Sequence, residues 1–289
     1  MLTIDAHQHF WKYNPIRDSW MTDEMHAIRK DFLPNHLHHL LKANGIDGCI
    51  AVQADQSEEE TKFLLQLTSE NTFIKGVVGW VNLQAESIED RLEYFSQFKL
   101  VKGFRHIVQS EPEDDFMLSN KFMYGISLLH KYNFTYDILI YPRHLPYAKK
   151  LVACFPQQRF VIDHIAKPNI RQHDLLQWKK HMLEIAAYEN VYCKISGMVT
   201  EAGWHTHTFK DFEPYLDVIV HAFGIDRIMF GSDWPVCLLS ASYKEVLGIV
   251  QEYFAAFSPV EQQMFFGGNA ISFYNLSIEQ TGVEFVGSE

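Results

Sequence analysis

Two histidines close to the N-terminus are spaced so that both imidazoles could act in one site. The stretch Asp5-Ala6-His7-Gln8-His9 lies in a β-rich run at the start of the chain. Because side chains alternate along a strand, Asp5, His7 and His9 are expected on one face, with both imidazoles at the C-terminal end. Two imidazoles that point into one cavity can bind a first-row metal ion or polarise a carbonyl group. Among 15 histidines one such pair is expected by chance, but its place at a strand end favours a site.

Two more ionisable groups end predicted strands. His164 ends the run Arg-Phe-Val-Ile-Asp-His, where burying an imidazole is costly without a partner or a purpose. Asp233 ends the run 227–233, and Gly231, two positions earlier on the same face, leaves room beside it. Each group alone also fits a satisfied polar residue of the core. Together with His7 and His9, they predict a catalytic constellation at the same ends of their strands.

A lysine accompanies this constellation. Lys194 and Ser196 share one face of the predicted strand 191–197. An amine is rarely buried without an anionic partner, so Lys194 is expected either in a core ion pair or as a substrate-binding group. Asp163 precedes His164 and faces the other way, so we expect it to contact a helix N-terminus or a basic group rather than substrate.

Short β-rich runs alternate with helical stretches along the chain. Several of the runs are apolar on both faces, which is typical of parallel strands covered on both sides. The predicted strands are 2–9, 48–55, 74–82, 100–107, 135–141, 159–165, 191–197 and 227–233. The clearest predicted helices are 33–45, 58–70, 175–189 and 242–257. No Pro/Gly/Ser-rich linker interrupts this alternation.

The strand ends recur about every 32 residues, which is the length of one βαβ unit. Eight such units predict an α/β fold, a single (β/α)8 TIM barrel over residues 1–276, followed by a C-terminal tail, 277–289. In such a barrel the active site lies at the C-terminal ends of the strands. A doubly wound open sheet would alternate in the same way, but no glycine-rich phosphate loop follows the first or second strand.

Several motifs in this order resemble the amidohydrolase superfamily. They match its amidohydrolase-related (family 2) branch of sugar-lactone hydrolases, of the L-fuconolactonase and L-rhamnonolactonase kind. The motifs are IDAHQHFW (4–11), KGFRHIVQSEPEDDFM (102–117), VIDHIAKP (161–168), KISGMVTEA (194–202), FGSDWPV (230–236) and FFGGNAISFYNL (265–276). The resemblance implies that His7 and His9 are the first-strand pair, His164 the later-strand histidine and Asp233 the last-strand aspartate.

The resemblance also bears on metal content. No lysine or glutamate ends the fourth strand to bridge two metal ions, because Lys102 lies at its start, and a second late histidine is not evident. A two-metal site is therefore not expected. The sequence leaves open one divalent ion, for which Zn²⁺ suits the ligand types best, or none. The ligands would be His7, His9, His164 and Asp233.

The expected reaction is hydrolysis of a small neutral sugar lactone, an aldonolactone, with Asp233 as the general base that activates water. The loops after the strands are expected to bind substrate, through Arg105, His106, Arg143, Lys194, Trp204 and Trp234. This set holds few cations and several aromatic groups. It therefore suits a substrate with hydroxyl groups and an apolar ring face better than a substrate with two carboxylates. The alternatives are a metal-dependent decarboxylase or hydratase of the same superfamily, or a barrel that binds a ligand without turning it over.

Composition limits the partners. The formal net charge of −11 argues against binding to nucleic acid or to an anionic membrane, because both need a positive face. The N-terminus lacks the pattern of a signal peptide, and no apolar run is long enough to span a membrane. The four cysteines are far apart, which fits reduced thiols in a cytoplasmic protein. A small-molecule substrate is the expected partner, and the sequence leaves a homo-oligomer open.

Overall fold

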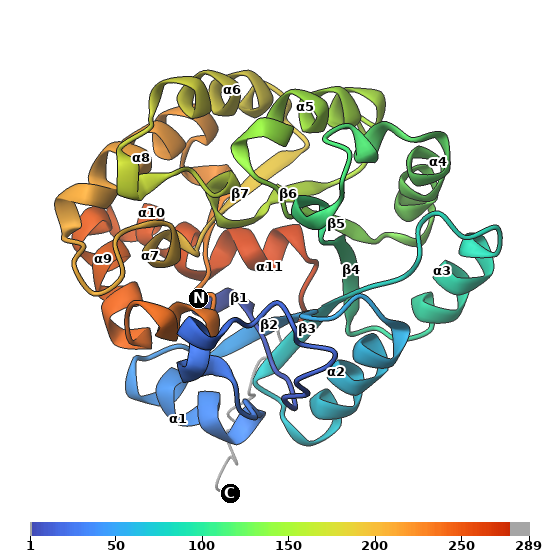
Figure 1. Cartoon of the computed structure of the whole chain (residues 1–289), viewed down its shortest axis with the longest axis horizontal. Helices are drawn as coiled ribbons and strands as arrows, with labels where there is room; N and C mark the ends of the chain where they lie inside the picture. The colour runs from blue at the N-terminus through green and yellow to red at the C-terminus, as the bar shows by residue number, and fades with distance from the viewer. Residues whose placement is uncertain (1, 278–289) are drawn as a thin grey trace, which may run out of the picture.

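Eight parallel strands form one sheet in a computed structural model, which describes residues 2–277. Each strand pairs with the next in sequence, and the last lies beside the first, where the Asp233 amide donates to the His7 carbonyl at 2.8 Å. The predicted (β/α)8 barrel is confirmed (Figure 1). The strands are β1 Ile4–Gln8, β2 Gly48–Val52, β3 Ile74–Gly79, β4 Val101–His106, β5 Thr135–Ile138, β6 Phe160–Ile162, β7 Val191–Ile195 and β8 Ile228–Phe230.

Helices surround this sheet on its outer side, except for the helix Asn269–Phe273, which lies across one end of the barrel (Figure 1). Their ends follow local sequence: Pro34 begins α1, Gly45 with a φ of 69° follows it, and the Ser57 hydroxyl accepts from the Glu60 amide at the start of α2. The helices are α1 Pro34–Ala43, α2 Glu58–Glu70, α3 Ile88–Ser96, α4 Asn120–Leu129, α5 Leu145–Cys154, α6 Leu176–Ala186, α7 Met198–Glu201, α8 Phe209–Phe223, α9 Tyr243–Phe254, α10 Pro259–Gln263 and α11 Asn269–Phe273.

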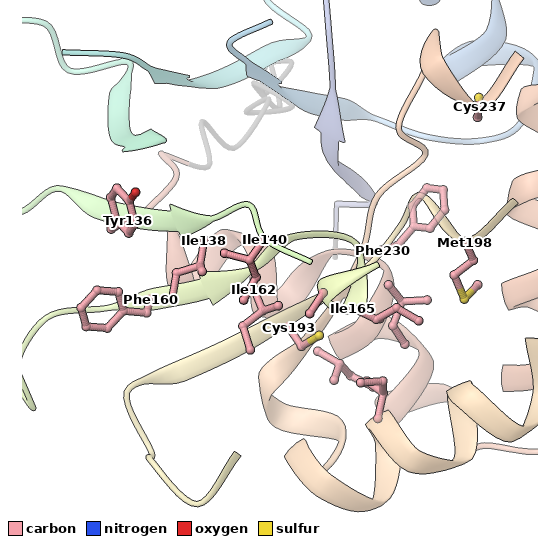
Figure 2. Close-up of a cluster of buried hydrophobic side chains, with 14 of the residues drawn as sticks. Tyr136, Ile138, Ile140, Phe160, Ile162, Ile165, Cys193, Met198, Phe230 and Cys237 are labelled. Atoms are coloured by element: carbon pink, nitrogen blue, oxygen red, sulfur yellow. The ribbon is translucent and has the colours of Figure 1, made fainter. Parts of the chain in front are cut away.

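Alternation along each strand divides the core into two parts. Outward side chains such as Tyr136, Phe160 and Cys193 pack under the helices (Figure 2). Inward side chains form a smaller apolar cluster inside the barrel, which α11 closes with Phe273 and Tyr274. The inner cluster consists of Ile4, Ala6, Ile50, Val52, Val78, Val161, Met229, Ala270, Phe273, Tyr274 and Leu276. The lower half of the barrel, at the N-terminal ends of the strands, is therefore filled mainly by apolar side chains, and the upper half, at their C-terminal ends, is left for a site.

A bulge in β1 changes which residues face inward. Asp5 pairs with Cys49 and Gln8 with Ala51, so two residues of β1 stand opposite the single residue Ile50 of β2. The expectation that Asp5 shares a face with His7 and His9 is therefore wrong. Asp5 points outward, where its carboxylate accepts hydrogen bonds from the Ser232 amide at 2.9 Å and the Tyr243 hydroxyl at 3.1 Å.

Within residues 2–277, none of the helices has the length and apolar character needed to cross a lipid bilayer. The expected C-terminal tail, 277–289, falls outside the described residues except for Ser277.

Candidate active site

Three imidazoles surround one carboxylate oxygen at the C-terminal ends of β1, β6 and β8. Asp233 Oδ1 lies 3.4 Å from His9 Nε2 and 3.9 Å from Nε2 of both His7 and His164. The two first-strand imidazoles approach each other to 3.2 Å between their Nε2 atoms. All four side chains are buried or nearly so. The four residues that the sequence singles out for catalysis are thus brought together.

Left-handed backbone turns aim two of these side chains. Asp233 has a φ of 57°, and four consecutive residues, His164 to Lys167, have φ between 48° and 58°. Each left-handed residue other than glycine costs roughly 1–2 kcal/mol. The Trp178 indole offsets part of this cost by donating to the Ile165 carbonyl at 2.7 Å. Simple alternation after Val161 would turn His164 out of the barrel, and the left-handed turn brings it back in.

Two glycines make room for the imidazoles. A Cβ at Gly197 would lie 2.6 Å from Nδ1 of His164, and one at Gly231 would lie 2.6 Å from the His7 Cβ. Gly197 also has a φ of 63°. The sequence predicts that Gly231 leaves room beside Asp233, and in the structure the His7 side chain occupies that room.

A buried ion network lies directly beneath the imidazoles. Lys194 Nζ donates to Asp137 at 2.5 Å and lies 3.0 Å from Asp163 Oδ1. Asp163 also accepts from Arg105 at 3.0 Å and lies 3.2 Å from His7 Nδ1. The Tyr274 hydroxyl, at the lower end of the barrel, completes the network by donating to Asp137 at 2.8 Å. The expectation that Asp163 contacts basic groups is confirmed. The expectation that it faces away from His164 is wrong, because the left-handed turn brings His164 back to the inner side of the barrel, where Asp163 also lies.

This environment sets the charge of several groups. Burial lowers the pKa of His7 and of His164 well below the ordinary value for histidine, so both imidazoles are neutral at neutral pH. Burial alone would raise the pKa of Asp163, but the charges of Lys194, His7 and Arg105 hold that pKa well below its usual range. The site therefore combines two neutral imidazoles, those of His7 and His164, with a carboxylate beneath them that is ionised at neutral pH.

Hydrogen bonds fix which imidazole nitrogens face the cavity. His9 Nδ1 lies 2.8 Å from the Val52 carbonyl, an acceptor, so Nδ1 carries the proton and Nε2 presents its lone pair. His164 Nδ1 lies 2.9 Å from the Ser196 hydroxyl, which leaves its Nε2 on the cavity side. Ligand atoms of His7, His164 and Asp233 lie within 4.8 Å of one another. These donors fit one divalent ion of the zinc type, and the ring orientations match those of metal-binding histidines.

A cavity of about 200 Å³ opens above these groups. Arg105 and Lys167 contribute cationic groups to its wall, and Trp11, Trp20 and Leu139 contribute apolar surface. Its lining consists of His9, Trp11, Trp20, Ala54, Arg105, Ile107, Gln109, Ser110, Leu139, His164, Lys167, Asp233 and Val236. A few polar groups within a mostly apolar wall are typical of a small-molecule site.

Of the residues expected to bind substrate, Arg105 lies in this lining, but its guanidinium is already bonded to Asp163 and to the Gln53 carbonyl. Lys194 is fully buried below the cavity in its ion pairs. The structure places the other four elsewhere. His106 is paired with Glu111, half-exposed Arg143 with Asp114, the Trp204 indole donates to the Thr200 carbonyl, and the Trp234 ring packs against Phe10 and Phe32.

Sequence reasoning missed several residues of the site. Asp137 is the one charged residue of its strand, Thr135–Ile138. A charged residue at an inward position of a strand indicates a site or a buried ion pair, and this signal could have identified Asp137. Trp11 and Lys167 lie inside two of the motifs, at 4–11 and 161–168, but no local pattern shows that they face a cavity. Trp20 lies outside the motifs and Tyr274 lies inside the motif 265–276, and both reach the site through contacts between segments far apart in sequence.

Comparison with known proteins identifies the family. A model of the amidohydrolase family matches residues 4–276, which is nearly the whole chain. The chain belongs to the amidohydrolase family. Two relatives of this amidohydrolase are an L-fucono-1,5-lactonase from Burkholderia multivorans and one from Burkholderia ambifaria. The first is 38% identical, over 95% of this chain and 96% of its own. The second is 34% identical, over 94% of this chain and 95% of its own.

A solved structure agrees with this relationship. A zinc-bound crystal structure of an amidohydrolase from Burkholderia multivorans superposes with a TM-score of 0.93 at 37% identity. The match covers 96% of this chain and 100% of that chain. The membership inferred from the sequence motifs is therefore confirmed.

The buried network leads to a stability prediction. Replacing Lys194 with methionine leaves Asp137 and Asp163 without their shared cation, so we expect a loss of about 3–5 kcal/mol in the free energy of unfolding. Denaturant unfolding followed by circular dichroism measures it.

The matched control is the double variant Lys194→Met/Asp137→Asn, which removes one of the two stranded charges. It should recover part of the lost stability. Equal stability of the wild type and Lys194→Met would contradict the role given to this ion network.

Proposed function

We propose that this amidohydrolase hydrolyses a neutral aldonolactone, with L-fucono-1,5-lactone as the first candidate because two relatives carry that activity in their names. The observation that carries the proposal is Asp233, ringed by three imidazoles on the floor of the cavity. A carboxylate that lies among imidazoles can take a proton from water and return it later. Plain ligand binding requires no such base.

The first step is attack of water on the lactone carbonyl. Asp233 accepts a proton from the water as its oxygen bonds to the carbonyl carbon, and the carbonyl electrons move onto oxygen. The second step breaks the bond between this carbon and the ring oxygen. Asp233 then gives its proton to the departing alkoxide, and the new carboxylic acid loses its own proton to solvent. The products are an open-chain aldonate and one proton.

The imidazoles have supporting roles in this proposal. His7 is neutral and held between Lys194 and Asp163 on one side and Arg105 on the other, so it keeps its orientation throughout the reaction. His9 and His164 border the cavity, each fixed through its Nδ1 atom. They orient the water and the substrate next to Asp233, and a fixed geometry lowers the entropic cost of reaching the transition state.

A single divalent ion, with zinc the first choice, would be held by His7, His9, His164 and Asp233. When bound, it would polarise the lactone carbonyl and make a neighbouring water more acidic.

The shape of the cavity supports a small neutral substrate. Trp11, Trp20 and Leu139 offer apolar surface for the CH groups of a sugar ring, while Gln109 and Ser110 can bond its hydroxyls. Arg105 is engaged by protein groups, so the lining lacks the several unpaired arginines that a dicarboxylate lactone calls for. A decarboxylase of the same fold would be inactive without its metal ion and would release CO₂. An assay for CO₂ release therefore distinguishes a decarboxylase from a lactone hydrolase.

We also propose a cytoplasmic location for the protein. Its four cysteines all lie within the described residues and all are free thiols, which suits a reducing compartment.

The substrate class is tested with a panel of lactones assayed by a pH indicator. We expect L-fucono-1,5-lactone and other neutral aldonolactones to be hydrolysed with a kcat/KM at least about tenfold above that of a dicarboxylate lactone, because two carboxylates would find too few cations. A reversed preference would overturn the substrate class, and inactivity on every lactone would overturn the reaction.

The role of Asp233 is tested by Asp233→Asn. We expect kcat to fall by at least about 100-fold with an unchanged circular dichroism spectrum, because general acid–base groups contribute 10²–10⁴-fold. Asp90→Asn, at an exposed position of α3, is the matched control and should retain wild-type turnover. Near-native turnover by Asp233→Asn on every substrate would remove this residue from the mechanism.

Metal content is tested by elemental analysis of protein purified without added metal. We expect at most one equivalent of a divalent ion per chain, because one cluster of three close donors exists within residues 2–277. Two equivalents of a transition metal would contradict this interpretation.

A further inference from the structure

The left-handed turn after β6 presents a second side chain to the cavity besides His164. The four residues His164 to Lys167 keep φ between 48° and 58°, and the Lys167 amide donates to the His164 carbonyl at 2.8 Å. Positions three apart in such a turn lie on one side, so His164 and Lys167 both line the cavity. Strained backbone of this kind persists where the surroundings hold it, and it concentrates at functional sites.

Lys167 differs from the other cations near the reacting centre. Lys194 is buried against Asp137 and Asp163, and the Arg105 guanidinium is bonded to Asp163. Across residues 2–277, no carboxylate oxygen lies within 4.0 Å of Lys167 Nζ, and its amine has no hydrogen-bond acceptor there. This half-buried ammonium group is thus left available to a ligand.

The immediate surroundings of the amine are aromatic and acidic. Its Nζ lies 5.7 Å from the centre of the Tyr141 ring, a cation–π arrangement that steadies the side chain without using its N–H donors. The charge of Lys167 also acts on Glu201, although burial of that carboxyl group outweighs it and raises the pKa of Glu201 to about 7. About half of that carboxyl group is protonated at neutral pH, which limits its competition for the amine.

We propose that Lys167 is a catalytic residue that binds the lactone carbonyl oxygen and stabilises the negative charge that develops on it. The inference rests on the proposed lactone hydrolysis. As water adds to the carbonyl carbon and Asp233 takes its proton, the carbonyl oxygen becomes an oxyanion, and the Lys167 ammonium donates a hydrogen bond to it. When the carbon–ring oxygen bond breaks, the electron pair returns and the oxygen becomes part of the carboxylate product.

The alternative role, binding a substrate hydroxyl, predicts different kinetics. A hydroxyl contact is equally strong in the ground state and the transition state, so its loss raises KM. An oxyanion contact strengthens only in the transition state, so its loss lowers kcat. Steady-state kinetics of one variant therefore separate the two roles.

The experiment replaces Lys167 with methionine, which keeps an unbranched side chain and the same backbone conformation. We expect kcat for L-fucono-1,5-lactone to fall by about 100-fold while KM changes less than about threefold, with chelator and with added Zn²⁺ alike. Lys167→Arg should retain more activity because it keeps the charge. Lys244→Met, at an exposed position of α9, is the matched control and should behave as wild type.

A binding measurement gives a readout that does not depend on turnover. Calorimetry compares L-fuconate, whose carboxylate carries the negative charge, with L-fucitol, the uncharged polyol of the same carbon skeleton. We expect Lys167→Met to weaken L-fuconate binding by at least about tenfold and to leave L-fucitol binding unchanged. Lys167→Gln serves as a second neutral variant if the methionine variant does not fold.

The outcomes separate the two proposals. If the wild type is active and Lys167→Met has the same kcat, the role of Lys167 is overturned and lactone hydrolysis still stands. The same conclusion follows if Lys167→Met loses affinity for L-fuconate and L-fucitol equally. A wild type that turns over no lactone overturns the proposed function, and unchanged L-fuconate binding by Lys167→Met then removes the anion-binding role as well.

Discussion

The balance of buried charge under the imidazoles is the constraint on which the rest of the site depends. Two cations, Lys194 and Arg105, meet two carboxylates, Asp137 and Asp163, where water does not reach. Removing one partner from such a group is far more costly than removing a surface pair. Because the charges cancel locally, His7 can stay neutral and immobile, and a stable platform carries the imidazoles and Asp233.

Much of the fold and the centre of the site could be predicted from sequence because both follow from local periodicity. Apolar runs at βαβ spacing predicted all eight strands, and the ends of those runs predicted the grouping of His7, His9, His164 and Asp233. The orientation of Asp5 could not be predicted, because the bulge in β1 depends on pairing with β2. The left-handed turn at His164 depends similarly on a distant indole, that of Trp178.

The cavity wall was predicted less well than the catalytic floor, and the reason is physical. Loop residues are positioned by contacts between segments far apart in sequence, so a charged or aromatic residue near a strand end can equally pack outward. Trp234 and Arg143 do so, while Trp20 and Lys167 face the cavity. Residue type alone does not distinguish these two cases.

The closure of the barrel by α11 affects the order in which the site can form. Tyr274 bonds to Asp137 from the lower end of the barrel, and Lys194 lies over its ring at 5.5 Å. Tyr274 follows all eight strands in the chain, so a group that surrounds the buried charges leaves the ribosome after the strands that carry them. A nascent chain that lacks this segment leaves Asp137 and Lys194 uncovered at this end of the barrel, so the dry, rigid centre forms only after α11 and Tyr274 have been made.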